Sequence, residues 1–336
     1  MKRRILLISL GSIGRRHLRN VKELMPNADL CIWRHKPADI PSEAENIPIV
    51  YSEEDALAFA PDAVMVSSPA SFHAAQCAPF AEKGIPIFVE KPLEVSVAAA
   101  SVLKTALDSG KGLLFVGYVL RFQPIMAALK SILDSQKIGT IRTAHIATGQ
   151  YLPDWRPDAD YRDGVSAQAA LGGGVLLELS HELDYARWFF GHPKTITSEA
   201  SKLSDLDMDV EDSATVIFGY PKARVTINID FLQRVAAMTL KVVGSEATLE
   251  ADLVAETARI CTPDGVQDLD LPKLTQGNEM YLRQFDAFFT QAFSEYIPVY
   301  EESRNSPFAR FEDALAVVGL VEAAKHSAAA GKRVDV

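Results

Sequence analysis

The start of the chain constrains the fold most, because an apolar run, a glycine turn and an amphipathic helix follow one another there. Ile5–Ile8 is uniformly apolar, which predicts a buried strand, and the turn Gly11–Gly14 comes soon after it. The next segment, Arg15–Met25, carries apolar residues at helical spacing and stops at Pro26. Strand, glycine turn and helix in this order are the context of a dinucleotide-binding fingerprint. We therefore predict an α/β fold that begins with a Rossmann domain.

The turn departs from the usual three-glycine pattern, because serine stands where the first glycine is common. The second glycine of such a turn lets the backbone approach a pyrophosphate, and the third lets the helix lie close to the strand. The first N–H groups of the helix would then hydrogen-bond the phosphates. The predicted cofactor contacts in this segment are Ser9, Gly11, Ser12, Ile13 and Gly14.

The second predicted strand, Leu30–Trp33, is followed by the basic cluster Arg34-His35-Lys36. An acidic residue at this place would accept hydrogen bonds from the adenosine ribose of NAD. Arg34 and His35 instead suit the additional 2′-phosphate of NADP, because a guanidinium can pair with phosphate oxygens in two places. NADP is therefore the predicted cofactor. NAD is the alternative, in which the cluster is only a solvated basic loop.

Two later apolar runs, Ala63–Val66 and Ile85–Val89, are predicted strands that end in polar residues. Ligands of open parallel sheets bind just beyond the carboxyl ends of the strands, so these residues should line the cofactor crevice. They are Ser67, Ser68 and Pro69 after the first run, and Glu90 and Lys91, followed by Pro92, after the second. The proline restricts the backbone around the lysine and would make this turn rigid.

His73 lies near the start of a predicted helix from about residue 71 to residue 83. One interpretation places its ring against the nicotinamide side of the cofactor. The other has the ring hydrogen-bonded to backbone near the start of the helix.

Length and composition exclude several classes of protein. A chain of 336 residues is long enough for two domains, and 48% hydrophobic with 23% charged residues is typical of a globular protein. A net charge of -10 argues against a general nucleic-acid binder. The cysteines Cys31, Cys77 and Cys261 form no CxxC pair, and no apolar run reaches the length of a membrane span. We expect a cytoplasmic protein without nucleic-acid or membrane partners.

A second group of candidate residues follows three glycines in the middle of the chain, at 172–174. Val175–Phe190 is a predicted helix in which Glu178, His181 and Asp184 are spaced three apart and share one flank. Histidine exchanges a proton near neutral pH, and a neighbouring carboxylate can fix its tautomer. The alternative is a structural histidine satisfied by local carboxylates. No metal site is predicted, because no further histidine or cysteine cluster supports one.

The segment 150–162 is too rich in proline and aromatic residues for a regular element, and its length suggests a functional loop. Its arginines could clamp an anionic group while its aromatic rings stack on a substrate. They could equally serve only to hold the loop in place. The predicted substrate contacts are Trp155, Arg156, Tyr161 and Arg162 in this loop, together with Arg121 at the start of the second domain.

The remaining sequence predicts a second α/β domain with an open, mostly antiparallel sheet. Residues 214–218 and 224–231 alternate apolar and polar around a Gly-Tyr-Pro turn, as in a hairpin. A sheet with one polar face suits a substrate wall or a subunit contact. We assign residues 1–120 to the Rossmann domain and residues 121–336 to the second domain, with the last helix a candidate for packing back on the first.

Several ordered motifs together resemble the glucose–fructose oxidoreductase / inositol dehydrogenase / rhizopine-catabolism family (Gfo/Idh/MocA). They are Gly11 to His17, Ser67 to His73, Glu90-Lys91-Pro92, Gly117 to Pro124 and Gly172 to Asp184. The resemblance implies a Rossmann domain followed by an α/β domain whose open sheet covers the cofactor and often mediates oligomerisation. It also implies that Lys91 is the catalytic lysine and that the peptide bond before Pro92 is a candidate for the cis form. The family usually has aspartate four residues before its histidine, whereas this chain has Glu178 three residues before His181.

The hypothesis from the sequence is an NAD(P)-dependent oxidoreductase that acts on a secondary alcohol or ketone of a sugar, sugar acid or nucleotide-sugar. His181 would exchange the hydroxyl proton, Lys91 would stabilise charge on the oxygen, and Glu178 or Asp184 would orient the histidine. A homodimer or homotetramer is expected. Two alternatives remain: NAD-assisted glycoside cleavage or other non-redox chemistry, as in some family members, and a regulatory protein that senses NADP without catalysis.

Overall fold

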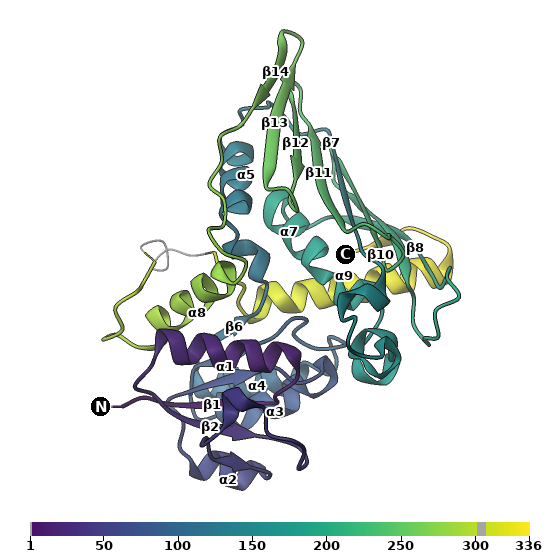
Figure 1. Ribbon diagram of the computed structural model, residues 1–336. Coiled ribbons are helices and arrows are strands. Elements are labelled where there is room, and N and C mark those ends of the chain that lie inside the picture. Colours follow the sequence, from purple (N-terminus) through teal and green to yellow (C-terminus); the bar gives the residue numbers. More distant parts are fainter. Residues whose placement is uncertain (1, 301–306) are drawn as a thin grey trace. The chain divides into compact units, whose positions relative to one another are not determined.

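The computed structural model describes residues 2–300 and 307–336, and these form two compact units. Unit 1 comprises Met1–Phe122 and Gln276–Leu315, and unit 2 comprises Gln123–Thr275 and Ala316–Val336. Figure 1 labels many of the helices and strands of both.

Unit 1 contains a six-stranded, fully parallel sheet of order β3-β2-β1-β4-β5-β6. Its strands are β1 (Arg4–Ile8), β2 (Asp29–Trp33), β3 (Ile49–Val50), β4 (Ala63–Val66), β5 (Ile87–Val89) and β6 (Leu114–Val116). The predicted apolar runs form strands of this sheet. Helices cover both faces of a parallel sheet, so the side chains of its inner strands are buried on both sides and are apolar. The strand order reverses between β1 and β4, which pair Ile8 with Val66. The predicted Rossmann fold is confirmed, and this reversal is the place where such sheets bind dinucleotides.

Two groups of helices cover this sheet (Figure 1). The helices of unit 1 are α1 (Ser12–Leu24), α2 (Glu53–Ala58), α3 (His73–Ala81), α4 (Ser101–Gly110) and α8 (Glu279–Ala292), with 3-10 turns η1 (Ser42–Ala44), η2 (Ala70–Phe72) and η3 (Val119–Phe122). Helix α1 contacts α8, and α3 contacts α4. The helix predicted from residue 71 begins with the 3-10 turn η2, so His73 is the first residue of α3.

The chain division differs from the predicted domain boundaries in one segment. Residues 276–315, which the sequence placed in the second domain, belong to unit 1. The reason is a ridge of aromatic side chains on α8, of which Phe285 and Phe288 lie edge-on against Phe88 at centroid distances of 4.8 and 6.0 Å. Burying these rings beside β5 brings together chain segments about 200 residues apart. An apolar helical stripe shows that a helix is buried, not which sheet it covers.

Unit 2 is built on a nine-stranded mixed sheet of order β14-β13-β12-β11-β7-β10-β9-β8-β15. Its strands are β7 (Thr143–Gly149), β8 (Thr195–Ser201), β9 (Ser213–Gly219), β10 (Arg224–Asp230), β11 (Ala237–Val243), β12 (Thr248–Asp252), β13 (Thr257–Thr262), β14 (Gly265–Asp268) and β15 (Val334–Asp335). Strands β7 and β10 are parallel, whereas the other recorded pairs are antiparallel. The predicted open, mostly antiparallel sheet is therefore confirmed.

Alternating side chains give this sheet one buried and one polar face. In β10, Val225, Ile227 and Ile229 are buried, and the residues between them are at least partly exposed. The helices of unit 2 are α5 (Pro124–Asp134), α6 (Val175–Glu178), α7 (Ser180–Phe190) and most of α9 (Phe311–Ala330), with 3-10 turns η4 (Leu152–Trp155), η5 (Tyr161–Asp163), η6 (Val165–Ala167) and η7 (Ala169–Leu171). Helices α6 and α7 contact β10.

The predicted helix Val175–Phe190 is wrong in one respect, because it is two helices. Leu179 has φ −97° and ψ 34°, which interrupts the helix between Glu178 at the end of α6 and Ser180 at the start of α7. Glu178 and His181 therefore do not share a flank of one helix, whereas His181 and Asp184 do. None of the helices in the described part of the chain is both long and apolar enough to span a bilayer.

Candidate functional site

The amino terminus of α1 presents its first N–H groups at the carboxyl edge of the unit 1 sheet. Gly11 precedes the helix with φ −63° and ψ −177°, and it has no side chain to cap those groups. The first turn of α1 carries no acidic residue. An uncapped helix amino terminus with backbone access is a ready site for a phosphate group. Ser12 and Ile13 are the first residues of this helix.

Three residues of this turn differ in what the structure requires at their positions. A Cβ added to Gly14 would lie 2.6 Å from Ser67 Oγ and 2.7 Å from the carbonyl oxygen of Ser9, so only glycine fits there. A Cβ added to Gly11 would meet nothing within 4 Å in the described residues, so no neighbour in the chain requires that glycine. Ser9 has φ 76°, a conformation that favours glycine, which explains the usual residue at this place. The space beside Gly11 is what a closely bound pyrophosphate would need.

A buried hydrogen bond supports the turn that carries Lys91. Glu90 Oε1 lies 2.7 Å from Nε2 of His17, a fully buried residue of α1, and Glu90 Oε2 accepts from the Lys91 backbone N–H at 3.2 Å. His17 Nδ1 has no hydrogen-bond partner in the described residues, so the proton of a neutral ring is best placed on Nε2, where it is donated to the carboxylate. The ring also lies edge-on against Phe88 and Phe285. Glu90 is therefore a support for Lys91.

The sequence reasoning assigned no role to His17. The available signal was its spacing of four from Val21, which is buried on the same helix. A histidine on the buried stripe of a helix needs a hydrogen-bond partner.

Lys91 is half-buried, and the bond between Lys91 and Pro92 is cis. His73 connects this turn to the end of β4, since Nδ1 lies 2.9 Å from the Pro92 carbonyl oxygen and Nε2 lies 2.8 Å from the Ser68 carbonyl oxygen. Burial lowers the pKa of His73. The structure thus has the backbone-bonded histidine of the alternative interpretation. A contact of His73 with the nicotinamide stays a prediction.

The other predicted cofactor residues of unit 1 also hold loops in place. Ser67 Oγ donates to the Ile8 carbonyl oxygen at 3.0 Å, joining β4 to β1, and Ser68 Oγ donates to Gln76 Oε1 at 2.6 Å. Pro69 precedes the 3-10 turn η2. Arg34 Nη1 donates to two loop carbonyl oxygens, each at 3.0 Å, while His35 is exposed.

Unit 2 contains the predicted proton-exchange group. His181, in the first turn of α7, is partly exposed, and Asp184 in the next turn is 1% exposed. Glu178, at the end of α6, accepts a hydrogen bond from Ser166 Oγ at 2.8 Å. Ser166 was not predicted, and no spacing in the sequence links it to Glu178, because the two are brought together by the 3-10 turns between them.

A cavity of about 190 Å³ lies in the predicted loop of unit 2. It is lined by Leu152, Trp155, Arg156, Ala159, Asp160, Tyr161, Asp163, Gly164 and Ser166. Three of the predicted substrate residues therefore share this cavity with the serine that binds Glu178. Trp155 also donates to the Gln150 carbonyl oxygen at 3.2 Å and lies edge-on against Phe231.

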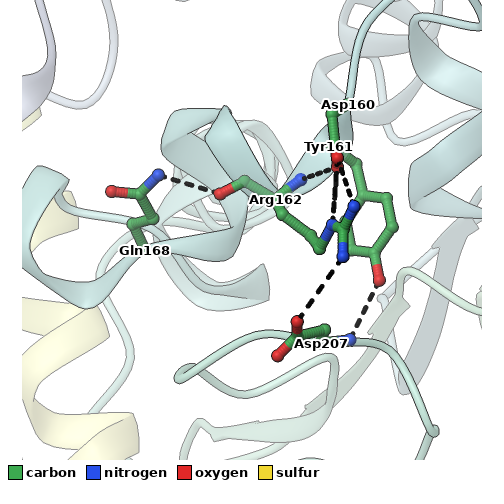
Figure 2. Close-up of polar contacts among 5 residues, drawn as sticks. All are labelled: Asp160, Tyr161, Arg162, Gln168 and Asp207. Atoms are coloured by element: carbon green, nitrogen blue, oxygen red, sulfur yellow. Dashed lines mark hydrogen bonds and ion pairs between the residues drawn. The ribbon is translucent and has the colours of Figure 1, made fainter.

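Arg162 is not among the residues that line this cavity. Figure 2 shows its guanidinium on the carboxylate of Asp160, with Nε–oxygen distances of 2.9 and 3.0 Å, and a longer 3.9 Å approach to Asp207. This contact lowers the pKa of Asp160 to about 2. Tyr161 accepts a hydrogen bond from the Asp207 N–H at 2.9 Å, so this pair fastens the loop.

Arg121 was predicted to contact substrate from the start of the second domain, but it belongs to η3 in unit 1. It is 5% exposed, and its Nη1 lies 3.4 Å from the Pro307 carbonyl oxygen. Within residues 2–300 and 307–336, no group of three or more His, Cys, Asp or Glu side chains is arranged to hold a metal ion.

Two protein-family models match the chain. One, described as an oxidoreductase family with an NAD-binding Rossmann fold, matches residues 3–118, and the GFO/IDH/MocA C-terminal domain matches residues 126–250. The inositol 2-dehydrogenase of Rhizobium meliloti is 25% identical over 345 residues, which cover 98% of each chain.

Solved structures share the fold over the whole chain. WlbA dehydrogenase from Bordetella pertussis, in complex with NADH and UDP-GlcNAcA, has a TM-score of 0.81 at 18% identity and is covered to 99%, against 100% of this chain. An oxidoreductase from Agrobacterium radiobacter, in complex with NAD+, L-tartaric acid and magnesium, has a TM-score of 0.83 at 19% identity, with coverage of 98% and 100% respectively.

Proposed function

The chain belongs to the Gfo/Idh/MocA family of oxidoreductases, and we propose that it interconverts a secondary alcohol and a ketone in a sugar, sugar acid or nucleotide-sugar. The observation that carries this proposal is the arrangement at the carboxyl edge of the unit 1 sheet. There an uncapped helix amino terminus, with open space beside Gly11, lies at the strand-order reversal, and Lys91 stands on a supported turn of the same edge.

The open space and the uncapped N–H groups fit the pyrophosphate of a nicotinamide dinucleotide. When bound, the cofactor would accept or supply the hydride at the carbinol carbon. Gly11, Ser12 and Ile13 would hold the phosphates through backbone N–H groups. Ser67, Ser68 and Pro69 would line the crevice beside them.

We assign the proton and charge chemistry to residues of this chain. The Lys91 ammonium would stabilise negative charge on the substrate oxygen, an effect that in enzymes amounts to about 3–4 kcal/mol for one well-placed donor. His181 would take the hydroxyl proton during oxidation and return it during reduction. Asp184, three residues later on α7, is the better candidate to orient His181, because Glu178 lies on a separate helix and accepts from Ser166.

We further propose that NADP is preferred over NAD. The relevant feature is the Arg34-His35-Lys36 cluster at the end of β2, where an acid would otherwise select NAD. Arg34 uses Nη1 for the loop carbonyls of Ala38 and Asp39, so its remaining donors would serve a 2′-phosphate. Arg34→Gln should then weaken NADPH binding by about tenfold or more and leave NADH binding nearly unchanged. Equal losses for both cofactors would contradict the preference.

A sugar-like substrate is supported by the cavity of the unit 2 loop and by the printed names of relatives. Trp155 and Tyr161 offer aromatic surface for a sugar ring, and Arg156 would pair with a carboxylate or phosphate. An inositol dehydrogenase and a dehydrogenase solved with a nucleotide-sugar are among the similar proteins. We also expect a homodimer or homotetramer.

Lys91→Met tests the function directly. The variant should still bind NADPH and NADH and should lose turnover of every sugar or uronic acid that the unmodified protein oxidises. The matched control is Lys104→Met, because Lys104 is an exposed lysine paired with Asp108 on α4. Near-normal turnover by Lys91→Met would remove the assignment.

The same assays separate the two alternative functions. A product formed with no net change in nicotinamide absorbance would indicate glycoside cleavage with transient use of the cofactor. Cofactor binding without turnover of any polyol would indicate a sensing protein.

A further inference from the structure

A basic pocket lies on the polar face of the unit 2 sheet, apart from every residue assigned above. Its volume is about 750 Å³. It is lined by Arg142, Thr143, Lys194, Thr195, Thr197, Ile217, Gly219, Tyr220, Pro221, Lys222, Ala223, Arg224 and Arg333. We call this set the basic pocket.

Strand register explains why these residues meet. Thr143, Arg224, Gly219 and Thr195 form one row across β7, β10, β9 and β8. Residues of one row in a sheet project from the same face. Arg333 directly precedes Val334, which pairs with Ile196, so it enters the row of Thr197 on that face. Residues far apart in the sequence thus contribute to one concave surface.

The charge of the basic pocket is one-sided. Five of its thirteen lining residues are arginine or lysine, and none is aspartate or glutamate. In the described part of the chain, none of the five takes part in an ion pair. All five are exposed, and Asp335, which pairs with Thr195 at the end of the same row, does not line the pocket. Five neighbouring cations in a protein of net charge -10 form a local positive field that attracts anions.

Other cations of the same face are neutralised. Lys241 of β11 lies opposite His145 of β7 in the sheet register. Its Nζ lies 2.9 Å from Glu250 Oε1. Arg259 Nη2 lies 2.8 Å from the other oxygen of Glu250. Among the described strand residues of this face, Lys241 and Arg259 outside the basic pocket share Glu250 as a counter-ion, whereas Arg224 inside it takes part in no ion pair.

Neutral donors complete the lining. Three threonine hydroxyls stand among the cations, at positions 143, 195 and 197. A Cβ on Gly219 would lie 2.3 Å from Thr195 Oγ1, so the glycine leaves that hydroxyl in place. Guanidinium, ammonium and hydroxyl groups around one cavity are the donor set that recognises phosphate oxygens.

We propose that the basic pocket binds a small anion that carries two or more phosphate groups. Its volume lies within the ~300–1,000 Å³ range of small-molecule sites. The concave form and the five cations that line it favour a compact polyphosphate over an extended acidic chain. Inorganic polyphosphate and nucleoside diphosphates share this chemistry.

The test is calorimetric titration of the cofactor-saturated protein at low salt with three probes: inorganic pyrophosphate, inorganic tripolyphosphate and UDP. Saturation with NADPH keeps the probes from the phosphate site of unit 1. We expect one site per chain, with affinity that falls as sodium chloride is raised. Tighter binding of UDP than of pyrophosphate, lost in the pocket variant described next, would indicate a nucleotide as the natural ligand of the basic pocket. The reverse order would indicate an inorganic polyphosphate. UDP binding that persists in that variant would belong to the proposed substrate site and would count against the basic pocket as a nucleotide site.

Matched double variants locate the site. Lys222→Gln with Arg224→Gln should weaken binding of the best probe by at least about tenfold, because two charge-assisted contacts are lost. Lys241→Gln with Arg259→Gln removes the same charge from the same sheet face and should change the affinity by less than about twofold. Thermal unfolding of both variants establishes that each is folded.

Three outcomes would overturn the proposal. They are absence of binding by all three probes at low salt, an equal loss of affinity in both double variants, and unchanged binding in the Lys222/Arg224 variant. If that variant instead changed the oligomeric state while no probe bound, the basic pocket would be a subunit contact and the small-ligand proposal would be wrong.

Discussion

Replacing two glycines of the turn before α1 by alanine, one at a time, should separate folding from cofactor binding. Gly14→Ala should destabilise the apoprotein, because its Cβ would lie 2.7 Å from the backbone oxygen of Ser9, which cannot move cheaply. Overpacking of this kind costs about 1–3 kcal/mol, and alanine recovers up to about 1 kcal/mol of helix propensity. The expected net loss is about 1–2 kcal/mol, or roughly 2–8 °C in the melting temperature of a unit of this size.

Gly11→Ala should leave the stability of the apoprotein nearly unchanged and should weaken cofactor binding. Its φ of −63° and ψ of −177° suit alanine, and the added Cβ meets nothing within 4 Å in the described residues, so the apoprotein should keep its stability within about 0.5 kcal/mol. The same methyl group would occupy the space that we assign to the pyrophosphate. Loss of one or two charge-assisted hydrogen bonds amounts to about 2–4 kcal/mol, which is roughly a 30- to 700-fold weaker cofactor affinity.

The two measurements are urea unfolding of the apoproteins and fluorescence titration with NADPH and NADH. Each variant serves as the control for the other, since both make the same substitution three residues apart. Tight cofactor binding by a stable Gly11→Ala variant would refute the assignment of the pyrophosphate site. An unchanged unfolding midpoint for Gly14→Ala would refute the steric argument.

Ser9→Gly should raise the free energy of unfolding of the apoprotein by about 1 kcal/mol in urea titration, because φ 76° strains serine; an unchanged midpoint would contradict this. Arginine contacts lower the pKa of Glu43 to about 2, so this carboxylate stabilises the folded state above its unfolded pKa of about 4.3. The stability deficit of Glu43→Gln should therefore shrink as the pH falls from about 4 to about 2, and a deficit that persists there in acid unfolding would be evidence against the ion pair. Cys261 should react with a thiol reagent in the folded protein, whereas the two buried cysteines, whose thiol pKa values burial raises, should be labelled only after unfolding, as mass spectrometry can establish.

Local sequence patterns predicted the parallel sheet of unit 1 well, because each of its buried strands appears in the sequence as a short apolar run. Ile5–Ile8 and Ala63–Val66 are buried on both faces, and their register places Ser9 and Ser67 at one edge. The glycine turn could be predicted in the same way, because a predicted strand precedes it and a predicted helix follows it. Its supports were less readable: the partner of Glu90 is a residue of α1, 73 positions away, and only the fold brings them together.

Unit 2 shows where periodicity stops being sufficient. The apolar stripe of Val175–Phe190 continues through Leu179, so its spacing gives no sign of the interruption there. The dihedral angles of one residue decide which side chains share a flank, and they move Glu178 away from the flank of His181 and toward Ser166. Tertiary contacts of the 3-10 turns make that choice, and helix propensity is too weak to oppose it.

The basic pocket could not be predicted from the sequence, because the order of the strands decides which residues meet there. Its charged residues precede, begin or connect strands that are neighbours only because β10 lies between β7 and β9 and because β15 pairs with β8. In the sequence the same residues read as ordinary polar turns, each with one or two cations. The positive charge indicates a binding site only once the strand pairing is known, because that pairing brings the cations of separate turns to one end of one sheet face. An unassigned ligand site in a familiar fold is therefore best sought where strand order gathers like charges that the surrounding sheet leaves without counter-ions.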